Sequence, residues 1–559
     1  MEKLQRLEFD IRGMTCDSCA LHVERALKKV SGVQEAEVPG WESGRASVLL
    51  EGDVDSQALI ESVRKAGYGA SVKARKPVVE REVEEPGSSD GREDGRLDLM
   101  VIGAGSAGFA AAIKAAELGY RVAMVEAGTI GGTCVNVGCV PSKTLIRAME
   151  QYHLAGTHRF QGVEIAAGHL RWPVIIDHKD RLVEEMRQSK YVDVLAAYPE
   201  ITYLQGRARL TGDNGVEIDG KTYTPGKILI TTGARSWAPP IPGLIEAGFL
   251  TSTTAMELKE LPRSMIVLGA NAVGLELAQT FARAGTNVTV LELLPRVAPF
   301  EDAEISEALE GYLEEEGLEI FTDFQTTRVE KRVGRYILSG SKDGEEMVFD
   351  AEQLLVATGR RPNTTGLGLE EAGVKLGPRG EILVDERLQT SNPEVYAAGD
   401  VTGQDMFVYV AAYGGGLAAE NALTGAGRVY DAAYIPRITF TDPQIASTGL
   451  TEEQAREQGY SVQVSTLPMS YVPRALAARD LRGLVKMVAD ADTDRLLGAH
   501  ILAPEAGEMI QTAVLAIRFG ITLTQLRETM FPYLTNVEGV KLAALAFEKD
   551  VALLSCCAG

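Results

Sequence analysis

Residues 97–128 read LDLMVIGAGSAGFAAAIKAAELGYRVAMVEAG, and this stretch decides the fold. A short apolar strand ends at a glycine turn, an alanine-rich helix follows, and a second apolar strand ends at Glu126. The glycines of the turn, Gly103, Gly105 and Gly108, let the backbone approach a pyrophosphate at the positive end of the helix. Glu126 lies about 20 residues downstream, where a carboxylate binds a ribose hydroxyl. The stretch therefore predicts a dinucleotide site in an α/β fold.

A second unit with the same pattern, MIVLGANAVGLELAQTFARAGTNVTVLEL, covers residues 265–293. It keeps the first and third glycines, Gly269 and Gly274, but Asn271 stands at the middle position. Asparagine tolerates a positive φ better than most residues, so we expect it to take the glycine's place in the turn. Repetition of the pattern predicts two bound nucleotides, one in each unit.

Glu292 follows the second strand of this unit, where the ribose of the nucleotide is expected to lie. A carboxylate there accepts hydrogen bonds from two ribose hydroxyls and repels a 2′-phosphate, which favours NADH over NADPH. The nearby Arg296 would offset part of this repulsion. The sequence therefore leaves both coenzymes, NADPH or NADH, open.

The peptide GGTCVNVGCVPSK, residues 131–143, follows the first unit and places Cys134 and Cys139 at the expected entrance of a helix. The helix dipole, the free N–H groups and the nearby Lys143 lower the pKa of a thiol there and favour the thiolate. Two buried, unreactive cysteines or half of a zinc site are the alternatives, but partner ligands at zinc spacing are missing from the sequence. A reactive thiol pair beside a dinucleotide is the favoured interpretation.

The 559 residues exceed the size at which one core stops growing, so several domains are expected. Residues 4–74 alternate apolar and helical runs in a β-α-β-β-α-β order, which predicts a small ferredoxin-like domain. A charged stretch rich in proline, glycine and serine follows, as in flexible linkers. The expected domains are residues 1–75, ferredoxin-like; 76–96, a flexible acidic linker; 97–260 and 363–430, the first Rossmann-like domain; 261–362, the second; and 431–559, an α+β domain without a nucleotide motif.

The formal charge of −22 disfavours binding to phosphate backbones and anionic lipids. No stretch approaches the ~20 uninterrupted apolar residues of a membrane span, and the first residues, MEKLQRLEFD, lack the apolar core of a signal peptide. We therefore expect a soluble, cytoplasmic protein that neither binds nucleic acid nor inserts into a membrane. In a reducing compartment, the six cysteines, which form three close pairs, indicate metal or redox chemistry.

The redox peptide GGTCVNVGCVPSK, the turn GAGSAG and the later motifs ATGRRPN and YAAGD together resemble the flavin disulfide oxidoreductases, which include glutathione reductase and dihydrolipoamide dehydrogenase. The resemblance covers residue 97 to the C-terminus and implies FAD in the first fold and a nicotinamide in the second, on opposite faces of the flavin. It implies that Cys139 lies against the isoalloxazine and that Cys134 exchanges with substrate. Lys143 would pair with Glu276 near the flavin. The positions that match FAD-lining residues of this family are Gly128, Thr133, Ala208, Asp400 and Val408.

The C-terminal part departs from the members that reduce organic disulfides. Those members carry a histidine that protonates the departing thiolate, but the matching stretch here is FPYLTNVEG, with Tyr533 at that place and Glu538 at the usual offset. Tyrosine titrates near ~10 and is a poor proton shuttle at neutral pH. This argues against ordinary dithiol exchange and requires a different electron acceptor.

The two other cysteine pairs suggest that acceptor. GMTCDSC, with Cys16 and Cys19, resembles the heavy-metal-associated domains of copper and mercury transport proteins, whose fold would cover residues 4–74; a thioredoxin-like redox motif is the weaker alternative. Thiolates select soft ions such as Hg(II) and Cu(I). Cys556 and Cys557 in the tail LSCCAG make a bidentate clamp for a soft ion, unless they are an accidental pair on a frayed end.

Together these features resemble the mercuric reductase family. The resemblance implies a homodimer, with residues 431–559 as the dimerisation domain. This dimer would transfer two electrons from NADPH or NADH through FAD to thiolate-bound Hg(II) and release Hg(0). The N-terminal domain would collect the metal, and the tail thiols of one subunit would deliver it to the redox pair of the other. The implied mercury ligands are Cys16, Cys19, Cys134, Cys139, Cys556 and Cys557.

Two tyrosines and several partners also follow from this resemblance. Tyr191 and Tyr533 match the tyrosines that flank the metal, although each alone would more often be a packing residue. Small thiols, mercury transport proteins and an organomercurial lyase are the implied partners. A dihydrolipoamide-dehydrogenase-like enzyme and a metal-buffering protein that is not an enzyme are the alternatives.

Overall fold

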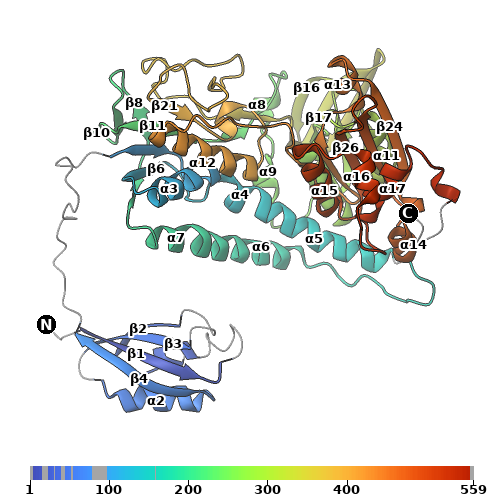
Figure 1. Cartoon of the computed structure of the whole chain (residues 1–559). Helices are drawn as coiled ribbons and strands as arrows, with labels where there is room; N and C mark the ends of the chain where they lie inside the picture. Colours follow the sequence, from blue (N-terminus) through green and yellow to red (C-terminus); the bar gives the residue numbers. More distant parts are fainter. Residues whose placement is uncertain are drawn as a thin grey trace. The chain divides into compact units, whose positions relative to one another are not determined.

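The computed structural model describes residues 4–14, 23–24, 26–30, 32–38, 44–51, 54–77, 97–157 and 159–553. Contacts within the chain separate two compact units, Met1–Gly95 and Arg96–Gly559, which are taken one at a time below (Figure 1). The last strand of the smaller unit extends to Pro77, two residues beyond the domain end expected at residue 75. The rest of the expected linker, residues 78–96, lies outside the described part of the chain.

The described part of the smaller unit is an antiparallel sheet with the helix α2. Its elements are β1 (Leu4–Arg12), β2 (Val33–Glu37), β3 (Arg45–Glu51), α2 (Ser56–Lys65) and β4 (Gly69–Pro77), with strand order β2-β3-β1-β4. Leu7, Phe9 and Ile11 are buried because alternate side chains of β1 face the same side of the sheet. Residues 23–24 and 26–28 are helical and lie between β1 and β2 in sequence, so the described elements follow the predicted order.

The first nucleotide-binding lobe of the larger unit is a parallel sheet flanked by helices. In spatial order its strands are β21 (Val395–Ala397), β11 (Lys227–Ile230), β5 (Leu99–Ile102), β6 (Val122–Glu126) and β7 (Ile201–Gln205). The predicted βαβ unit is present as β5, α3 (Ser106–Glu117) and β6. In Figure 1, α3 lies beside α12 (Val408–Thr424). Since β21 and α12 follow the second lobe in sequence, the chain returns to complete the first.

The second nucleotide-binding lobe repeats this architecture. Its parallel strands, in spatial order, are β15 (Glu319–Phe321), β14 (Asn287–Leu291), β13 (Ser264–Leu268) and β19 (Gln353–Val356). The predicted second βαβ unit is present as β13, α10 (Ala272–Arg283) and β14. Helix α11 (Ala303–Glu315) and the antiparallel strands β16 (Gln325–Arg332), β17 (Arg335–Lys342) and β18 (Glu345–Ala351) follow.

The C-terminal part is an α+β domain, as predicted. Its antiparallel strands, in spatial order, are β22 (Arg437–Thr439), β23 (Gln444–Gly449), β26 (Leu496–Ala503), β25 (Leu484–Asp490) and β24 (Val462–Pro468). Helices α15 (Ala506–Arg518), α16 (Leu523–Glu528) and α17 (Glu538–Leu545) follow β26 in sequence. Met509, Ile510 and Ala513 of α15 are buried in one cluster with residues of β23, β25 and β26, because residues three or four apart share a helix face.

The connection between β6 and β7 carries the redox peptide. Its elements are α4 (Gly132–Val137), α5 (Cys139–Gly156), α6 (Trp172–Arg187), the π-helix η2 (Gln188–Val192) and α7 (Asp193–Ala196). The remaining elements are β8 (Ala208–Leu210), β9 (Val216–Ile218), β10 (Lys221–Tyr223), β12 (Ala234–Ser236), α8 (Leu244–Ala247), α9 (Ser252–Ala255), β20 (Arg360–Pro362), η3 (Asp400–Thr402), α13 (Glu452–Glu457), η4 (Met469–Tyr471), α14 (Pro473–Ala478) and η5 (Val551–Leu553). None of the described helices combines the length and the apolar character that a bilayer crossing requires.

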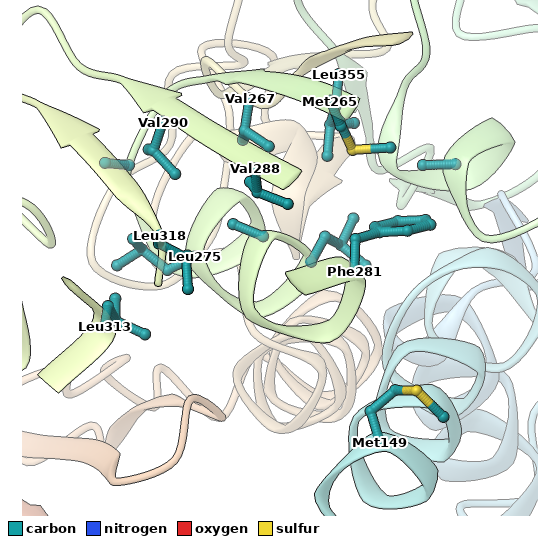
Figure 2. Close-up of a cluster of buried hydrophobic side chains, with 14 of the residues drawn as sticks. Met149, Met265, Val267, Leu275, Phe281, Val288, Val290, Leu313, Leu318 and Leu355 are labelled. Carbon is teal, nitrogen blue, oxygen red and sulfur yellow. The ribbon is translucent and has the colours of Figure 1, made fainter. Parts of the chain in front are cut away.

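A buried apolar cluster joins α5 and α6 to the second lobe. Figure 2 shows Met149 on its helix and Phe281 on the neighbouring one, below the strand that carries Met265 and Val267. The ring of Trp172, on α6, lies 5.7 Å from that of Phe281 between centroids. Truncating a buried aromatic residue such as Phe281 to alanine typically costs about 3–5 kcal/mol. Because α5 begins at Cys139, this packing fixes the helix that carries this thiol.

Candidate functional site

One cavity of about 1810 Å³ is lined by both glycine turns and by the cysteine pair. A single small-ligand pocket has about 300–1,000 Å³, so this volume has room for more than one large ligand. The predicted site residues that line the cavity are Gly103, Gly105, Glu126, Thr133, Cys134, Cys139, Lys143, Ala208, Gly269, Asn271, Glu276, Glu292, Asp400 and Val408. Residues far apart in sequence therefore meet here, as a shared dinucleotide and redox site requires.

In the first glycine turn, neighbouring backbone atoms leave no room for a side chain at Gly103 or Gly108. Gly103 has φ +111°, and a Cβ there would overlap the carbonyl oxygen of Thr231. A Cβ at Gly108 would overlap the carbonyl oxygen of Gly103, so this glycine packs the helix onto the turn. Glu126 clamps the turn from the next strand, because its carboxylate accepts hydrogen bonds from the Ala104 N–H at 2.8 Å and the Gly128 N–H at 2.6 Å. Gly105, Ser106 and Ala107, at the N-terminus of α3, line the cavity, where a pyrophosphate can bind.

The second glycine turn repeats this geometry. Gly269 has φ +105°, and a Cβ at Gly274 would overlap its carbonyl oxygen. The expectation that Asn271 uses its tolerance of positive φ is wrong, because its φ is −101° and its backbone is extended. Asn271 is instead the N-cap of α10, where its side-chain oxygen accepts from the Ala272 N–H at 2.9 Å. The equivalent Gly105 is also extended, with φ −85°, so this position does not require a glycine conformation.

Cys134 and Cys139 lie on adjoining helices as a hydrogen-bonded pair of free thiols. Cys134 belongs to α4, and Cys139 is the first residue of α5, which confirms the expected helix entrance. The hydrogen bond from Cys134 and the charge of Lys143 lower the pKa of Cys139 to about 7, against the effect of burial. The same hydrogen bond, together with burial, raises the pKa of Cys134. Cys139 is therefore the thiol that is more readily ionised.

Lys143 forms the ion pair that the family resemblance implies. Its Nζ donates to Oε2 of Glu276 at 2.8 Å, and it lies 4.5 Å from the ring centroid of Phe440. Glu276 is 5% exposed, and its other oxygen accepts from the Phe440 N–H at 2.9 Å. A carboxylate from the second lobe thus connects the redox helix to the C-terminal domain. Phe440 was not predicted, because its contact with Lys143 depends on the fold and leaves no motif.

Asp400, at the start of η3, lines the cavity in the first lobe. Burial raises the pKa of this carboxyl, and the guanidinium of Arg360, 3.7 Å away, opposes the shift. Thr133, Ala208 and Val408 line the same cavity, on α4, β8 and α12. A half-buried carboxyl facing a cavity suits the hydroxyls of a flavin's ribityl chain. The residues present therefore fit FAD.

Tyr191 lies beside the cysteine pair on the π-helix η2. Its ring meets Phe109 edge to face, with centroids 4.8 Å apart, and a Cβ on Gly131 would lie 3.2 Å from it. Burial raises the pKa of the phenol, a hydrogen bond with Ser106 opposes this, and the two cysteines add to the rise. Single π-turns are frequent at functional sites. The structure thus places Tyr191 near both sulfurs, as predicted.

Asn136 lies on α4 between the two cysteines and was missed from the sequence. Its amide donates to the carbonyl oxygens of Ile130 and Gly132, at 2.9 and 2.8 Å. Its own oxygen accepts from Arg187 of α6 at 3.0 Å. This arginine lies just before the π-helix that carries Tyr191. The side-chain amide of Asn136 therefore contacts both the segment around the start of α4 and the helix that leads to Tyr191. The signal was present, since Asn136 stands inside the redox peptide.

Tyr533 does not line the cavity of its own chain. It lies between α16 and α17 and is 52% exposed. Cys16, Cys19, Cys556 and Cys557 lie outside the described residues, so the geometry of these predicted ligands is not described here. Within the described ranges, no group of three or more histidine, cysteine, aspartate or glutamate side chains is arranged to hold a metal ion.

Three family models match the chain. The pyridine nucleotide-disulphide oxidoreductase model matches residues 97–416, and the dimerisation domain of the same family matches residues 435–544. The heavy-metal-associated domain model matches residues 8–69. These matches agree with the predicted architecture of two nucleotide-binding lobes, a C-terminal dimerisation domain and an N-terminal metal domain.

Two curated relatives and one solved structure show the same likeness. The chain is 45% identical over 552 residues to mercuric reductase of Staphylococcus aureus, covering 99% of each chain. It is 49% identical over 470 residues to mercuric reductase of Streptomyces lividans, covering 83% of this chain and 98% of that one. The copper(II) complex of the HOCl-induced flavoprotein disulfide reductase RclA of Escherichia coli has a TM-score of 0.72 at 31% identity, covering 81% of this chain and 99% of that one.

Proposed function

Because the chain belongs to the mercuric reductase family of the pyridine nucleotide-disulphide oxidoreductases, we propose that Cys134 and Cys139 hold Hg(II) while it is reduced. The enzyme is a flavoprotein mercury(II) reductase that uses FAD and a reduced nicotinamide. The balance is one NAD(P)H and one Hg(II) giving NAD(P)⁺, one proton and Hg(0). The observation that carries the assignment to these two residues is a hydrogen-bonded thiol pair in the cavity that both nucleotide turns line.

The residues around the cavity have distinct roles in this proposal. Gly103, Gly105 and the start of α3 bind the FAD pyrophosphate, and Asp400 binds the ribityl chain. The matching turn of the second lobe, with Gly269 and Asn271, binds the nicotinamide coenzyme. Bound FAD supplies the two-electron carrier between the nicotinamide and the metal site. Lys143, held by Glu276, keeps a positive charge beside Cys139.

The substrate Hg(II) binds to the two sulfurs because it is a soft, positively charged ion. Two thiolates neutralise the cation, and sulfur ligands are preferred by soft ions. Cys139 is ionised near neutral pH, and Cys134 loses its proton when it replaces a small thiol on the incoming metal. Tyr191 packs against the loop of Cys134 and holds its geometry without competing as a strong ligand. After reduction Hg(0) has little affinity for thiolates and leaves.

The residue expected at the place of the acid separates this function from dithiol exchange. Tyr533, which one subunit contributes to the other's site in this proposal, stands where members that reduce organic disulfides carry a histidine. Reduction of an organic disulfide needs a positioned acid for the departing thiolate, whereas reduction of Hg(II) needs no proton at sulfur. This observation favours the metal ion over lipoamide or glutathione disulfide as the electron acceptor.

The second subunit completes the site in this proposal. Tyr533 and the tail thiols Cys556 and Cys557 of one subunit serve the redox pair of the other, and Cys16 and Cys19 collect Hg(II) beforehand. Exposure of Tyr533 on the dimerisation domain supports this arrangement. The reaction takes place in the cytoplasm, where reduced nicotinamide is available. Small thiols deliver Hg(II), and transport proteins or an organomercurial lyase would supply it.

Anaerobic turnover tests this function. The holoenzyme is mixed with NADH or NADPH, excess small thiol and Hg(II), and both coenzyme oxidation and release of volatile mercury are followed. We expect one Hg(0) for each coenzyme oxidised, and no release from the Cys134→Ser variant. Oxidation with lipoamide but not with Hg(II) would overturn the proposal.

A further inference from the structure

We propose that a second cavity of the larger unit binds a small oxyanion, a phosphate or a carboxylate. This cavity has a volume of about 390 Å³ and shares no lining residue with the cavity of the redox pair. Its volume lies within the range of small-ligand pockets, about 300–1,000 Å³. The residues that line it are Arg159, Tyr312, Arg479, Asp480, Leu481 and Arg482. Because the two cavities are separate, the inference goes beyond the proposed function and does not depend on it.

Three parts of the larger unit meet at this oxyanion cavity. Arg159 follows α5, Tyr312 lies on α11 of the second lobe, and Arg479 is the C-cap of α14 in the C-terminal domain. The Nε of Arg479 donates to the carbonyl oxygen of Arg159 at 2.8 Å, and Figure 1 shows the end of α5 close to α14. A ligand in the cavity would therefore contact segments that are far apart in the sequence.

Asp480 lines the oxyanion cavity, but its charge is already paired. It is 7% exposed, and its Oδ1 and Oδ2 accept from Nε and Nη2 of Arg482 at 2.9 and 3.0 Å. The guanidinium of Arg159 forms a further ion pair with Oδ2. Against the effect of burial, these two arginines lower the pKa of Asp480, so the carboxyl is ionised at neutral pH. A carboxylate that two guanidinium groups neutralise does not repel an incoming anion as an unpaired one would.

Arg479 is a positive charge in excess of the ion pairs around the cavity. These pairs join three guanidinium groups to three carboxylates, which are Arg159, Arg283 and Arg482 with Glu316, Asp442 and Asp480. Burial and the charge of Arg283 lower the pKa of His153, which lies 4.0 Å from Glu316, so this histidine adds no charge at neutral pH. Within the described part of the chain, Arg479 has no carboxylate in ion-pair contact. The network and Arg479 together therefore favour an anion.

The donors left for a ligand belong to Arg479 and Tyr312. Among the described residues, the Nη groups of Arg479 have no hydrogen-bond partner, while the bond from Nε holds the guanidinium in place. The Tyr312 hydroxyl accepts from the Gly483 N–H at 3.0 Å, and its own proton has no acceptor in the part of the chain that the structure describes. A guanidinium presents two parallel N–H groups that match the paired oxygens of a phosphate or a carboxylate. These groups favour an oxyanion over a neutral ligand.

Calorimetric titration of the holoenzyme tests the inference, with inorganic phosphate and citrate as separate probes. The enzyme is saturated with its nicotinamide coenzyme, so that the pyrophosphate site of the second lobe is occupied. We expect one probe or both to bind with a dissociation constant of roughly 1 mM or below at low salt, since a few charge-assisted hydrogen bonds give affinity in this range. Chloride should weaken the binding, because salt screens the attraction between charges. No binding of either probe at about ten times this concentration would overturn the proposal.

Two arginine variants assign the binding to this cavity. Arg479→Ala removes the guanidinium that no carboxylate pairs and should weaken binding at least about tenfold. Arg474→Ala is the matched control, because Arg474 lies on α14, is exposed and does not line the cavity. It removes the same charge and should change the dissociation constant by less than about twofold, since screening weakens the effect of a distant surface charge. Equal weakening in the two variants would show that net charge and not the cavity attracts the anion, which would overturn the proposal.

Urea unfolding of the holoenzyme gives a second readout. A ligand that binds only the folded protein raises the midpoint of unfolding. Phosphate also stabilises folded proteins in general, so each protein is compared in the probe and in chloride of equal ionic strength. The midpoint should rise more for wild type and for Arg474→Ala than for Arg479→Ala, because the general effect is common to all three proteins. An equal rise in all three would contradict a specific site at Arg479.

Discussion

The two sulfurs of the redox pair differ because one thiol donates its hydrogen bond to the other. That donation stabilises a thiolate on Cys139 and holds the proton on Cys134. Lys143 adds a positive charge whose position is fixed by Glu276. The asymmetry gives the enzyme one sulfur that is ready to bind a cation and one that ionises only when the metal arrives.

The first prediction concerns the ionisation of Cys139 in reduced, mercury-free enzyme. Its alkylation rate, followed by peptide mapping, should rise with pH through a midpoint of about 7, because only the thiolate reacts. Cys134→Ala removes the main hydrogen bond and should move the midpoint to higher pH. Cys134→Ser keeps a donor and should shift it less. One common midpoint for all three proteins would contradict the role of this bond.

The second prediction concerns Glu276, whose carboxylate serves two donors. Glu276→Ala leaves Lys143 and the Phe440 N–H without this acceptor and should lower the free energy of unfolding by about 2 kcal/mol, as for other hydrogen bonds to charged groups. Glu276→Gln keeps one acceptor and should lose less. Urea unfolding of the larger unit measures both. Equal stability of the alanine variant and wild type would show that the pair is not a structural connection.

At the scale of elements, the redox site depends on how α6 is joined to α4. Arg187 near the end of α6 donates to Asn136 within α4, and the π-helix that carries Tyr191 begins at the next residue. Hydrogen bonds in a π-helix span one residue more than in an α-helix, so the turn that carries Tyr191 is wider than an α-helical turn. This hydrogen bond therefore joins the end of α6, next to the segment that carries Tyr191, to the helix that carries Cys134.

The third prediction tests this connection. Arg187→Ala removes the bond to Asn136 but leaves the two hydrogen bonds that Asn136 donates within its own loop. Hydrogen exchange across α4 should become a few-fold faster, because local opening is easier with fewer contacts. Lys190→Ala, an exposed change on the same π-helix, is the control and should leave exchange unaltered. Equal exchange rates in α4 for both variants would contradict the proposed coupling.

The βαβ units were predictable because strand, glycine turn and helix are local patterns whose period is visible in the sequence. The pairing of Lys143 with Glu276 was also predictable, but only through a family resemblance, since the two lie 133 positions apart. Phe440 and Arg187 were missed because their contacts arise where distant elements pack together. The role of Asn271 was predicted wrongly for a different reason. The motif suggested a positive φ at this position, whereas the extended backbone found there makes Asn271 the N-cap of α10.

At the scale of the whole molecule, one chain does not bring every predicted site residue to the cavity. Tyr533 is exposed on the domain that matches the dimerisation model and does not line its own cavity. A two-fold dimer places the same surface of each subunit against the other, so a residue of one subunit can complete the site of its partner. The tail thiols follow this domain in sequence, and the resemblance to mercuric reductases implies that they serve the partner's redox pair.

The last prediction uses mixed dimers, purified through two different tags and assayed on thiol-bound Hg(II). One dimer combines a Cys134→Ser subunit with a subunit carrying Cys556→Ala and Cys557→Ala. If the tail serves the partner, one intact redox pair meets one intact tail, and about half of wild-type activity per dimer is expected. The control dimer puts all three changes in one subunit. Its unchanged redox pair then faces only the altered tail, so activity should be low; the reverse result for the two dimers would mean that each tail serves its own subunit.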